Sequence, residues 1–524
     1  MTQPHHRSTR AAIFVFAILT VVITFNSTQS THAAERNIIL FITDDQSPDT
    51  GAYGNPVIQT PHMDALAADG TLFTHAFATT ASCSASRSVI LTGLHNHANG
   101  QFGHQHDFHK FSSFPNVKSL PVLLEAAGYR TARIGKYHVA PESVYRFQHA
   151  LPGNSRHPVQ MADNARAFIA GDDDADADET NADRPFFLLF ATSDPHRGGG
   201  FAEELPHKPD RFGNLPDNAA RPNLKAVTYS PDDVIVPPFL PDNPTTRAEL
   251  AQYYQSVSRV DQGLGRLIQH LKETNQYDNT LILFISDHGI AFPGAKTTVY
   301  EPGLRSPAII RNPYESNRGV IQSAMISWVD LTPTILDFAG VYNNATQSIP
   351  ADIAVREGQI GTDRQWRDPD NNNQPRPYTF HGRSFLQLLD GRDPGDPWNT
   401  IYASHTFHEI QMYYPMRVFR TRNHKLIWNI AHPLPFPFAS DLWIAPTWQR
   451  QYGLGPDAPY GQRTVGQYLQ HPEFELFDLS ADPHESNNLA DSPDHAQLLN
   501  EMKQKLRDFQ QRTNDPWILK WEYE

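Results

Sequence analysis

The sequence contains one cysteine among 524 residues, Cys83. A single thiol cannot form an internal disulfide, so no disulfide framework holds this fold together. Basic residues are also in short supply: Lys and Arg total 43 against 57 Asp and Glu, and the formal net charge at pH 7 is −14. This balance excludes a general binder of nucleic acid or of membrane surfaces, which would carry a basic stripe. A polyanionic ligand therefore needs a local pocket of Arg and Lys.

The N-terminus carries an apolar run from Ala11 to Phe25, preceded by basic residues and followed by small residues at Ala33–Ala34. This pattern predicts a secretory signal peptide over residues 1–34. A membrane anchor is the alternative, but the run falls short of the about 20 apolar residues of a spanning helix. We therefore expect export and no stable membrane insertion after cleavage. The one glycosylation sequon of the mature region, Asn344–Ala345–Thr346, favours a periplasmic or secreted bacterial protein over a lysosomal one.

Composition and periodicity predict an α/β fold. With 39% hydrophobic and 19% charged residues, the chain is able to bury a sizeable core. Apolar runs of strand length cover residues 38–43, 129–135, 184–192 and 279–287, and helical periodicity covers residues 119–128 and 245–275. Strands that are apolar on both faces and are separated by helices indicate a mostly parallel, two-sided sheet.

The chain changes character near residue 340. Residues 341–380 are polar and rich in Asn, Asp, Gln and Pro, which predicts a long loop or insertion. Beyond it, segments such as "IYASHTF" and "FELFDL" and a last helix near 495–512 indicate a smaller α+β domain over 396–524, after a larger domain over 35–395. The acidic run "GDDDADADET" (171–180) lacks the glycine and the distal glutamate of an EF-hand loop, and we interpret it as a solvated surface loop.

Four predicted strands end in residues that are able to bind or react. They are followed by Asp44–Asp45, by Lys136–Tyr137–His138, by Ser193–Asp194–Pro195–His196 and by Asp287–His288. Asp or Gly after a strand is an ordinary turn former. In an open α/β sheet, however, ligands bind beyond the carboxyl ends of the strands. Carboxylates, imidazoles and a lysine at four such ends therefore predict one shared site.

The residue types at this site suit a metal ion and a tetrahedral anion. The candidate metal ligands are Asp44, Asp45 and Asp287. Carboxylate oxygens are hard ligands that suit Ca²⁺ or Mg²⁺ better than zinc, which favours His and Cys. The cations that would hold the anion are Arg87, Lys136 and Lys296.

Proton transfer and nucleophilic attack need further groups. His138 and His196 are candidates for acid and base near neutral pH. An ordinary nucleophile is missing from the set, and Cys83 is the candidate for that role. The alternative is a buried cysteine that acts as a small apolar side chain.

The surroundings of Cys83 resemble a known family signature. "CSASR" followed by "SVILTG" is similar to the sulfatase signature, C-x-P/A-x-R with L-T-G downstream, with Ala85 at the position where Pro is more frequent. The stretches "DDQSPDTGAYGN", "TPHMDALAADG", "IGKYHV", "SDPH", "ISDHG" and "DLTPTILDFAG" occur in the order found in that family. Outside the shared signature, stretches such as "HEIQMYYPMR" and "FELFDLSADPHESNNLA" resemble its sulfamidase branch. The similarity covers nearly the whole mature chain.

The resemblance implies a fold, two cofactors and a role for each residue. The implied fold is alkaline-phosphatase-like: a large, mixed, mostly parallel sheet flanked by helices, with a smaller C-terminal α+β domain. A maturation enzyme would convert Cys83 into Cα-formylglycine. Ca²⁺ would be bound by Asp44, Asp45, Asp287, His288 and the modified Cys83. Arg87, Lys136 and Lys296 would hold the sulfo group, and His138 and His196 would transfer protons. The substrate pocket would involve His106, His408, Glu409 and Arg417.

The function implied by the resemblance is hydrolysis of the N-sulfate of a terminal glucosamine in heparan- or heparin-type glycans. An O-sulfatase acting on another sulfated carbohydrate is the first alternative. A phosphate or phosphonate monoester hydrolase and a non-catalytic glycan binder are further alternatives. The implied partners are a sulfated glycan or sugar, the formylglycine-generating enzyme and a second copy of the chain in a homodimer.

Two other histidine-containing motifs are candidates for a catalytic or a metal site. Asp482–Pro483–His484 repeats the "DPH" of the strand end, and we interpret it as a structural turn. His104, His106 and His109 stand at metal-compatible spacing, but no carboxylate or thiol set completes a zinc site in that stretch, so we interpret it as a substrate-lining loop.

Overall fold

A computed structural model describes residues 1–2, 36–172, 184–198, 211–215, 221–349, 367–368, 374–375 and 378–523. The predicted signal peptide, most of the acidic run and most of the polar segment 341–380 lie outside these residues. Residues Glu35–Glu524 form one unit, to which all of the following refers. Among the described residues, the helices are too short or too polar to cross a membrane.

The main sheet has eight strands in the order β10-β2-β9-β8-β1-β7-β5-β6. In chain order they are β1 (Asn37–Thr43), β2 (Thr71–Phe77), β5 (Arg130–Gly135), β6 (His149–Leu151), β7 (Phe186–Ala191), β8 (Thr280–Ser286), β9 (Ala308–Arg311) and β10 (Val320–Ser327). Strand β9 pairs antiparallel with β8 and β2, and the other neighbours pair parallel. The predicted mixed, mostly parallel sheet is confirmed.

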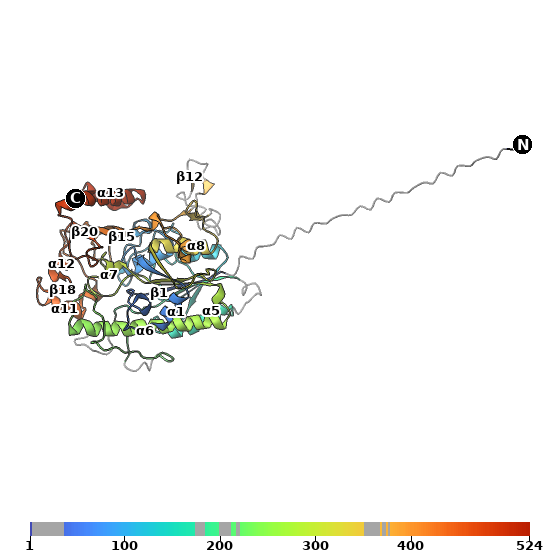
Figure 1. The fold of residues 1–524 in the computed structure, drawn as a ribbon, viewed down its shortest axis with the longest axis horizontal. Helices are drawn as coiled ribbons and strands as arrows, with labels where there is room; N and C mark the ends of the chain where they lie inside the picture. Colours follow the sequence, from blue (N-terminus) through green and yellow to red (C-terminus); the bar gives the residue numbers. More distant parts are fainter. Residues whose placement is uncertain are drawn as a thin grey trace. The chain divides into compact units, whose positions relative to one another are not determined.

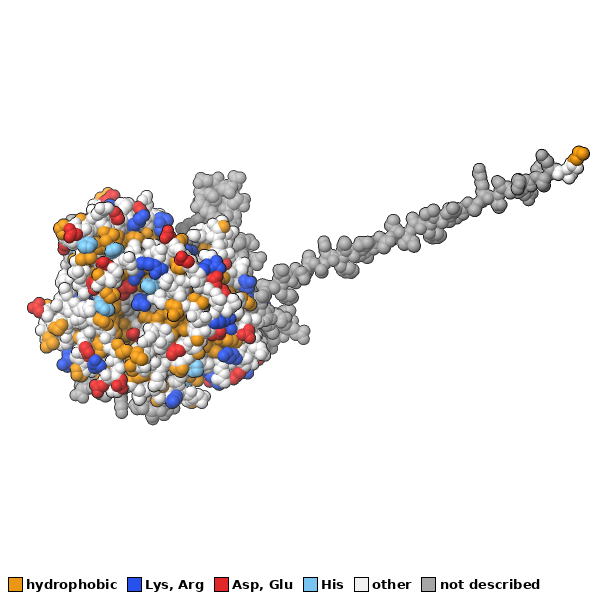
Figure 2. All heavy atoms as spheres, in the orientation of Figure 1, with side chains coloured by type: hydrophobic (Ala, Val, Ile, Leu, Met, Phe, Trp, Pro, Cys, Tyr) orange, Lys and Arg blue, Asp and Glu red, His pale blue; other side chains and the backbone are white. Residues whose placement is uncertain are grey.

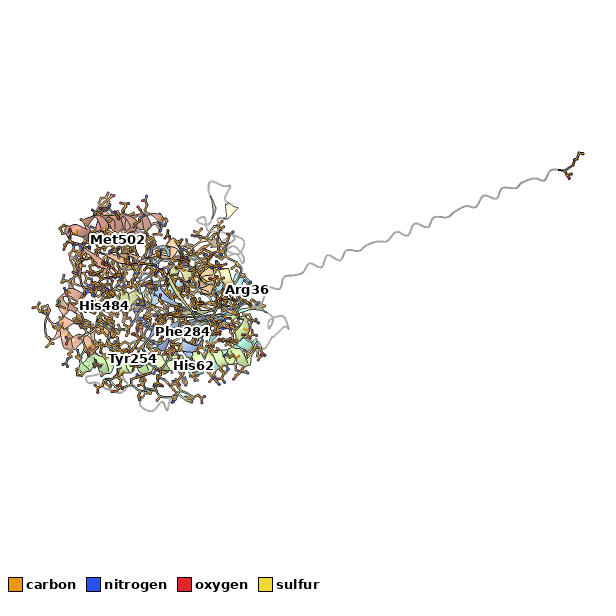
Figure 3. The ribbon with its side chains drawn as sticks, in the orientation of Figure 1. Arg36, His62, Tyr254, Phe284, His484 and Met502 are labelled. Atoms are coloured by element: carbon orange, nitrogen blue, oxygen red, sulfur yellow. The ribbon has the colours of Figure 1, made fainter. Side chains whose placement is uncertain are left out.

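Helices cover both faces of this sheet. One face packs on α1 (Pro61–Ala68), α5 (Pro158–Ala170) and α6 (Pro244–Glu273), and the other on α2 (Cys83–Thr92), α4 (Leu120–Ala126) and α8 (Leu331–Phe338). In Figure 1, α6 runs along α1 and α5 on one side of β1, with α8 on the other. Figure 3 marks Phe284 of β8 and Tyr254 of α6, which belong to the same hydrophobic cluster. Alternate residues of one strand enter opposite cores, which explains the uninterrupted apolar runs of the sequence.

Helix α6 begins where local signals place its start. The Asn243 side chain accepts hydrogen bonds from the backbone N–H groups of Thr245 and Thr246, at 3.0 and 3.1 Å. Pro244 occupies the first helical position, where its missing N–H costs nothing. The helix predicted over residues 245–275 is therefore found at Pro244–Glu273.

A second, antiparallel sheet follows in the C-terminal part. Its strands are β15 (Thr400–His405), β16 (Met416–Thr421), β17 (His424–Asn429) and β20 (Phe474–Asp478). Helix α13 (Ala496–Arg512) packs Met502 and Leu506 against Trp428 and Leu476 of this sheet. The backbone N–H of Ser404 donates to Thr79 O at 2.8 Å, so this sheet contacts the segment leading into α2. The division of the chain at residue 395 stays a prediction.

Shorter elements complete the described fold. The short helices are α3 (Asn96–Asn99), α7 (Glu301–Leu304), α10 (Ser440–Trp443), α11 (Pro446–Tyr452) and α12 (Val465–Leu469). Two-residue strands pair as β3 (Gln105–His106) with β4 (His109–Lys110), β11 (Ser348–Ile349) with β14 (Tyr378–Thr379), β12 (Arg367–Asp368) with β13 (Gln374–Pro375), and β18 (Pro459–Tyr460) with β19 (Arg463–Thr464). Basic and acidic side chains are interspersed over the face shown in Figure 2.

Candidate active site

Four neighbouring strands deliver their carboxyl ends to one edge of the sheet. Strands β8, β1, β7 and β5 lie side by side, and their last residues are in register, with Thr43 opposite Ser286 and Ala191 opposite Gly135. The residues that follow these ends are the predicted Asp44–Asp45, Lys136–His138, His196 and Asp287–His288. The shared site predicted from four separate turns is therefore one place in the structure.

Cys83 is the first residue of α2 and is fully buried. Its Sγ lies 3.5 Å from His288 Nε2 and 3.7 Å from Asp45 Oδ1. Arg87 stands about one helical turn later, on the same face of α2. The Ser86 hydroxyl donates to Asp287 O at 2.5 Å, which fixes the start of the helix against the β8 end. The spacing of the signature thus presents a thiol and a guanidinium to the same site.

Arg87 and Lys136 neutralise two of the carboxylates. Arg87 Nη2 donates to Asp44 Oδ1 at 3.1 Å, and its Nε donates to Asp287 Oδ2 at 3.0 Å. Lys136 Nζ forms an ion pair with Asp44 Oδ2. Arg87, Asp44 and Asp287 are buried and the Lys136 side chain is 16% exposed, so the ion pairs act with little solvent screening.

Lys296 links the site to the C-terminal part of the chain. Its Nζ lies 2.9 Å from Asp45 Oδ2, 3.0 Å from His196 Nε2 and 3.0 Å from Asp441 Oδ2. Asp441 belongs to α10, far from the other site residues in sequence. Lys296 is therefore held between two carboxylates and an imidazole.

Burial and the neighbouring charges together shift the pKa values of the three carboxylates in different directions. For Asp44, burial acts to raise the pKa, but Lys136, His196 and Arg87 more than reverse this and hold it well below its ordinary value. Burial raises the pKa of Asp45 to about 6. Burial and the neighbouring Asp44 charge raise the pKa of Asp287 well above its ordinary value. Two carboxylates thus lack full compensation by the protein's own cations, as expected for a cation site.

The nitrogen and sulfur groups also respond to burial. Burial raises the pKa of the Cys83 thiol well above its ordinary value, so the thiol is protonated and a poor nucleophile at neutral pH. Burial, together with Lys296 and Lys136, lowers the pKa of His196 well below its usual range. Burial with Lys136 and Arg87 does the same for His138. Both imidazoles are neutral at pH 7 in this state of the protein.

The donor set beside Cys83 fits a hard divalent cation. One ligand atom from each of Asp45, Cys83, Asp287 and His288 lies within 4.8 Å of every other. His288 Nδ1 lies 3.0 Å from Gly289 O, so Nδ1 carries the hydrogen and Nε2 presents its lone pair to the carboxylates. A backbone carbonyl behind a ligating imidazole is the usual arrangement in metal sites. The carboxylates of Asp45 and Asp287, with Asp44 alongside them, supply the hard oxygen ligands that suit Ca²⁺, and His288 adds one oriented nitrogen ligand.

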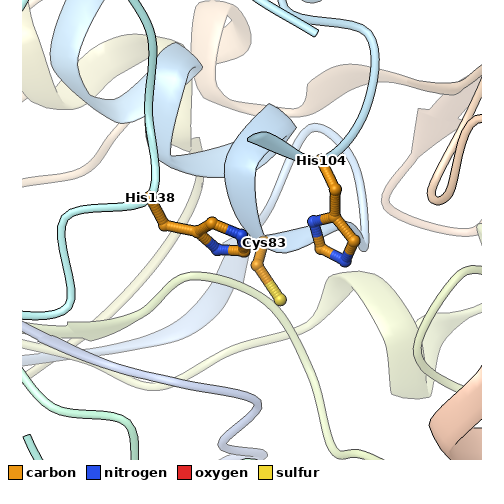
Figure 4. A group of neighbouring side chains, drawn as sticks. All are labelled: Cys83, His104 and His138. Atoms are coloured by element: carbon orange, nitrogen blue, oxygen red, sulfur yellow. The ribbon is translucent and has the colours of Figure 1, made fainter. Parts of the chain in front are cut away.

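Histidines line the other side of Cys83. Figure 4 shows the Cys83 side chain between the imidazoles of His104 and His138. His106, on the β3–β4 hairpin, stacks on His138 with ring centroids 5.0 Å apart and is partly exposed. His109 Nδ1 accepts the Ile410 N–H at 3.1 Å, which ties the hairpin to the turn at 408–411. The predicted substrate-lining loop thus lies beside the thiol.

His408 and Glu409 shape the site by holding other residues. His408 is buried, with Nδ1 3.0 Å from Ser82 Oγ and Nε2 2.7 Å from His104 Nε2. Glu409 Oε1 accepts the Ser440 N–H and hydroxyl at 3.1 and 2.6 Å, next to Asp441. Both side chains are buried. His408 therefore positions His104, and Glu409 positions Ser440, beside the predicted pocket.

Arg417, which was predicted to bind substrate, lies inside the protein. Arg417 is 1% exposed, and its Nε and Nη2 donate to both oxygens of Asp515 at 2.5 and 3.0 Å. Its Nη1 donates to the backbone oxygens of His405 and Met416. All three nitrogens are engaged with Asp515 and with backbone oxygens, so we expect Arg417 to act as a structural residue rather than to bind substrate.

Two residues that contribute to the site, Asp441 and Arg156, were not predicted from the sequence. Asp441 follows a proline-rich stretch without any motif, and only the fold brings it to Lys296. Arg156 Nη1 lies 2.7 Å from Asp194 Oδ1, and its Nη2 donates to His196 O at 3.2 Å, which fixes the turn that carries His196. The second "DPH" is a turn as predicted, since Asp482 accepts the N–H groups of Ser486 and Asn487.

Comparison with known proteins agrees with this geometry. The sequence model of the sulfatase family matches residues 36–341. Human N-sulphoglucosamine sulphohydrolase is 38% identical over 501 residues, which cover 93% of this chain and 92% of that protein. An ulvan-active sulfatase of Formosa agariphila is 28% identical over 473 residues, covering 90% of this chain and 78% of that protein.

Solved structures share the fold at lower identity. The structure of BT4656 in complex with its substrate D-glucosamine-2-N,6-O-disulfate has a TM-score of 0.59 at 22% identity, covering 92% of this chain and 98% of that one. The phosphonate monoester hydrolase of Agrobacterium radiobacter has a TM-score of 0.57 at 18% identity, covering 91% and 96%. Together with the mixed eight-stranded sheet and the smaller antiparallel sheet, this likeness confirms the predicted alkaline-phosphatase-like fold.

Proposed function

The chain belongs to the sulfatase family, and we propose that it is an exported, calcium-dependent enzyme that hydrolyses the N-sulfo group of a terminal glucosamine in heparan- or heparin-type glycans. Sulfatase activity follows from membership of the family. Beyond that activity, we propose the identity of the substrate, the bound calcium ion and the export of the protein. The 38% identity with the human N-sulphoglucosamine sulphohydrolase along nearly all of both chains supports this substrate.

The local environment of the Cys83 side chain is the observation that most directly supports this proposal. The buried thiol lies beside Asp45 and His288, at the start of the helix that also presents Arg87. A thiol whose pKa is raised by burial has little use as a nucleophile. This setting therefore suits a cysteine that is converted before it works. Cα-formylglycine would supply a hydrated aldehyde, with one oxygen to accept the sulfo group and a second to expel sulfate.

Three cations would bind the sulfo group. Arg87, Lys136 and Lys296 approach the site from α2, the β5 end and the loop after β8. In this structure the three cations form ion pairs with Asp44, Asp45 and Asp287. Preorganised cations of this kind stabilise charge that develops on the oxygens of a transferred group. Asp44, Asp45, Asp287, His288 and the modified Cys83 would hold Ca²⁺, which would add positive charge on the same side of the substrate.

Two imidazoles would handle protons. His196 Nε2 lies 3.0 Å from the Lys296 ammonium and accepts its hydrogen bond, so Lys296 would supply the proton that passes through this nitrogen to the leaving group. Among the described residues, neither ring nitrogen of His138 has a hydrogen-bond partner, and the imidazole lies beside Cys83. A neutral imidazole so placed is able to take a proton from a hydroxyl at that position.

The leaving group of an N-sulfo substrate is an amine, and Asp441 favours it over an alcohol. Its carboxylate lies 3.0 Å from Lys296 and 3.9 Å from His196, and its side chain is 21% exposed. An amine or ammonium donates more hydrogen bonds than a hydroxyl, and a carboxylate only accepts them. An O-sulfated sugar fits the same core, which keeps the O-sulfatase as the second candidate.

The remaining parts of the proposal concern partners. A sulfated sugar is the substrate, and a formylglycine-generating enzyme is required to mature Cys83. Cleavage of the signal peptide would release the protein to the periplasm or the medium. Assembly into a homodimer stays a prediction.

A substrate panel tests the proposal. Purified, matured enzyme is assayed for sulfate release from N-sulfoglucosamine and from glucosamine 6-O-sulfate, and for phosphate release from an aryl phosphate. We expect the largest kcat/KM with N-sulfoglucosamine. Release from the O-sulfated sugar alone would contradict the N-sulfo assignment, and a preference for the phosphate ester would contradict the sulfatase itself.

A further inference from the structure

Before conversion, Cys83 lies in a second ligand set that differs in chemistry from the calcium ligands. One atom each from Cys83, His104 and His138 lies within 4.8 Å of the others. The three residues come from separate elements: the start of α2, the loop before β3 and the segment after β5. We propose that the unconverted chain binds a thiophilic divalent ion such as Zn²⁺ through the Cys83 thiolate and the His104 and His138 imidazoles.

The unused bonding capacity of His138 supports this site. Both of its ring nitrogens are inaccessible to solvent and make no hydrogen bond within the described structure. An unsatisfied buried polar group costs about 1–3 kcal/mol. The His138 backbone also has a left-handed φ of 58°, which is unfavourable for a residue with a Cβ. An imidazole with two unpaired buried nitrogens is able to bind a metal ion without giving up a hydrogen bond within the described structure.

His104 is oriented by a chain of hydrogen bonds behind it. Its Nε2 is 2.7 Å from His408 Nε2, and His408 Nδ1 is 3.0 Å from Ser82 Oγ. Its Nδ1 has only a 3.5 Å contact, to Ser84 Oγ. The pairing at Nε2 leaves Nδ1 as the ligand nitrogen, and Figure 4 shows the two imidazoles on either side of the thiol. A hydrogen-bonded partner behind a ligating imidazole is the rule in metal sites.

The donor types select the metal. One thiolate and two imidazoles suit Zn²⁺ and its spectroscopic substitute Co²⁺, and leave a fourth position open for water. Bonds of about 2.0–2.3 Å require the three ligand atoms to close in slightly from their present separations. On binding, the thiol proton is released to solvent and a sulfur–metal bond replaces it, so no oxidant or reductant takes part.

The carboxylate side of Cys83 is the competing position for such an ion. There, Asp45 accepts from Lys296 and lies against His288, and Asp287 accepts from Arg87. A metal using these groups would share the carboxylates with Lys296 and Arg87, whereas the ring nitrogens of His138 have no hydrogen-bond partner among the described residues. The site is thus expected on the histidine side, where an ion would cover the thiol and mark the unconverted form of the protein.

Cobalt titration of the full-length chain, produced without a formylglycine-generating enzyme, tests this site. Mass spectrometry first verifies that Cys83 is intact, and saturating Ca²⁺ fills the oxygen ligands. We expect one equivalent of Co²⁺ to bind with thiolate-to-cobalt charge-transfer absorption, and Zn²⁺ to displace it. Cys83→Ser removes the charge-transfer band, and His104→Gln and His138→Gln each weaken binding by about tenfold or more.

Matched variants keep the test decisive. His484→Gln, in the turn at residues 482–484, leaves the affinity unchanged, and circular dichroism verifies the fold of each variant. If one of the two ligand variants misfolds, the other decides. An absence of charge transfer in the wild-type chain overturns the proposal. So does a loss of affinity in His288→Gln with none in His104→Gln and His138→Gln. The outcome is independent of the proposed function, because it concerns the thiol and needs no turnover.

Discussion

Lys296 Nζ lies 3.0 Å from Asp441 Oδ2, and this ion pair joins the end of the main sheet to a helix of the C-terminal part. Asp441 is in turn held by its neighbour Ser440, which donates to Glu409. The turn at 408–409 therefore supports both the start of α2, through His408 and Ser82, and the carboxylate beside Lys296. Helix α10 and the turn at 408–409, both in the C-terminal part of the chain, thus contact the site at the end of the main sheet.

Asp441→Asn is expected to impair turnover. Lys296 loses one of its two carboxylate partners, and a lost charge-assisted hydrogen bond costs about 1.5–3 kcal/mol, which corresponds to about 10- to 100-fold in kcat/KM for N-sulfoglucosamine. Steady-state kinetics measure the change. Asp242→Asn, which removes a surface ion pair with Arg247, serves as the control. Wild-type kinetics in Asp441→Asn would remove Asp441 from the proposed leaving-group side.

Lys136→Met is expected to lower kcat by about 100- to 1,000-fold, the typical cost of losing one preorganised group that stabilises transition-state charge. Its ammonium pairs with Asp44 and lies at the β5 end, next to the site. Lys225→Met, on the surface, should match the wild type. A small effect on kcat with a large rise in KM would show that Lys136 binds the substrate and the transition state equally well and does not lower the barrier of the chemical step.

Removal of calcium is expected to abolish sulfate release reversibly. The buried carboxylates of Asp45 and Asp287 have raised pKa values without a metal, so a bound cation relieves an unfavourable state. Ca²⁺ at about 100 times its Kd would also stabilise the fold by about 2.7 kcal/mol. Assays after chelation and calcium add-back, with thermal unfolding at each step, measure both effects. A chelated protein that is free of metal by elemental analysis and still fully active would contradict the proposed cofactor.

Asp515→Asn is expected to destabilise the protein without changing turnover per folded molecule. It leaves the buried Arg417 guanidinium without its charge partner, which costs about 3–5 kcal/mol near neutral pH. Although burial opposes ionisation of Asp515, Arg417 more than offsets this and lowers the pKa from 3.8 to about 2.

The sign of the pH dependence follows from that lowered pKa. Stabilisation by the Asp515 carboxylate is complete above about pH 4 and is lost as the pH falls towards 2, because the unfolded chain binds its proton first. The difference in unfolding free energy between wild type and Asp515→Asn should therefore shrink by about 2 kcal/mol over this window. Denaturant unfolding at several pH values measures it. A constant difference would contradict the lowered pKa of Asp515, and a loss of kcat at neutral pH would instead support Arg417 as a residue of the substrate pocket.

The strands and their functional ends were predictable because their signals are local. Buried parallel strands are continuous apolar runs, and the residues that follow each run stand at its carboxyl end. Strand β1 and helix α6 were therefore placed within one or two residues. The same reasoning brought Asp44, Lys136, His196 and Asp287 to one edge of the sheet without any knowledge of the strand order.

Other parts of the site depend on contacts between distant segments. Asp441 meets Lys296 across 145 residues of chain, and its own sequence neighbours carry no motif. The burial of Arg417 was not predicted, for a related reason. Its partner Asp515 is 98 residues away, and the sequence near Arg417 does not show that its guanidinium faces the interior. Pairings of this kind are set by packing of the complete fold.

The central claim is that Cys83 works only after conversion to an aldehyde. Its most direct test compares, across preparations made with increasing amounts of formylglycine-generating enzyme, the rate of sulfate release with the fraction of Cys83 peptide that has lost H₂S and gained one oxygen atom by mass spectrometry. We predict a rate proportional to the converted fraction, extrapolating to zero for the intact thiol and absent in Cys83→Ala. Full activity in a preparation whose Cys83 is entirely unconverted would contradict the account.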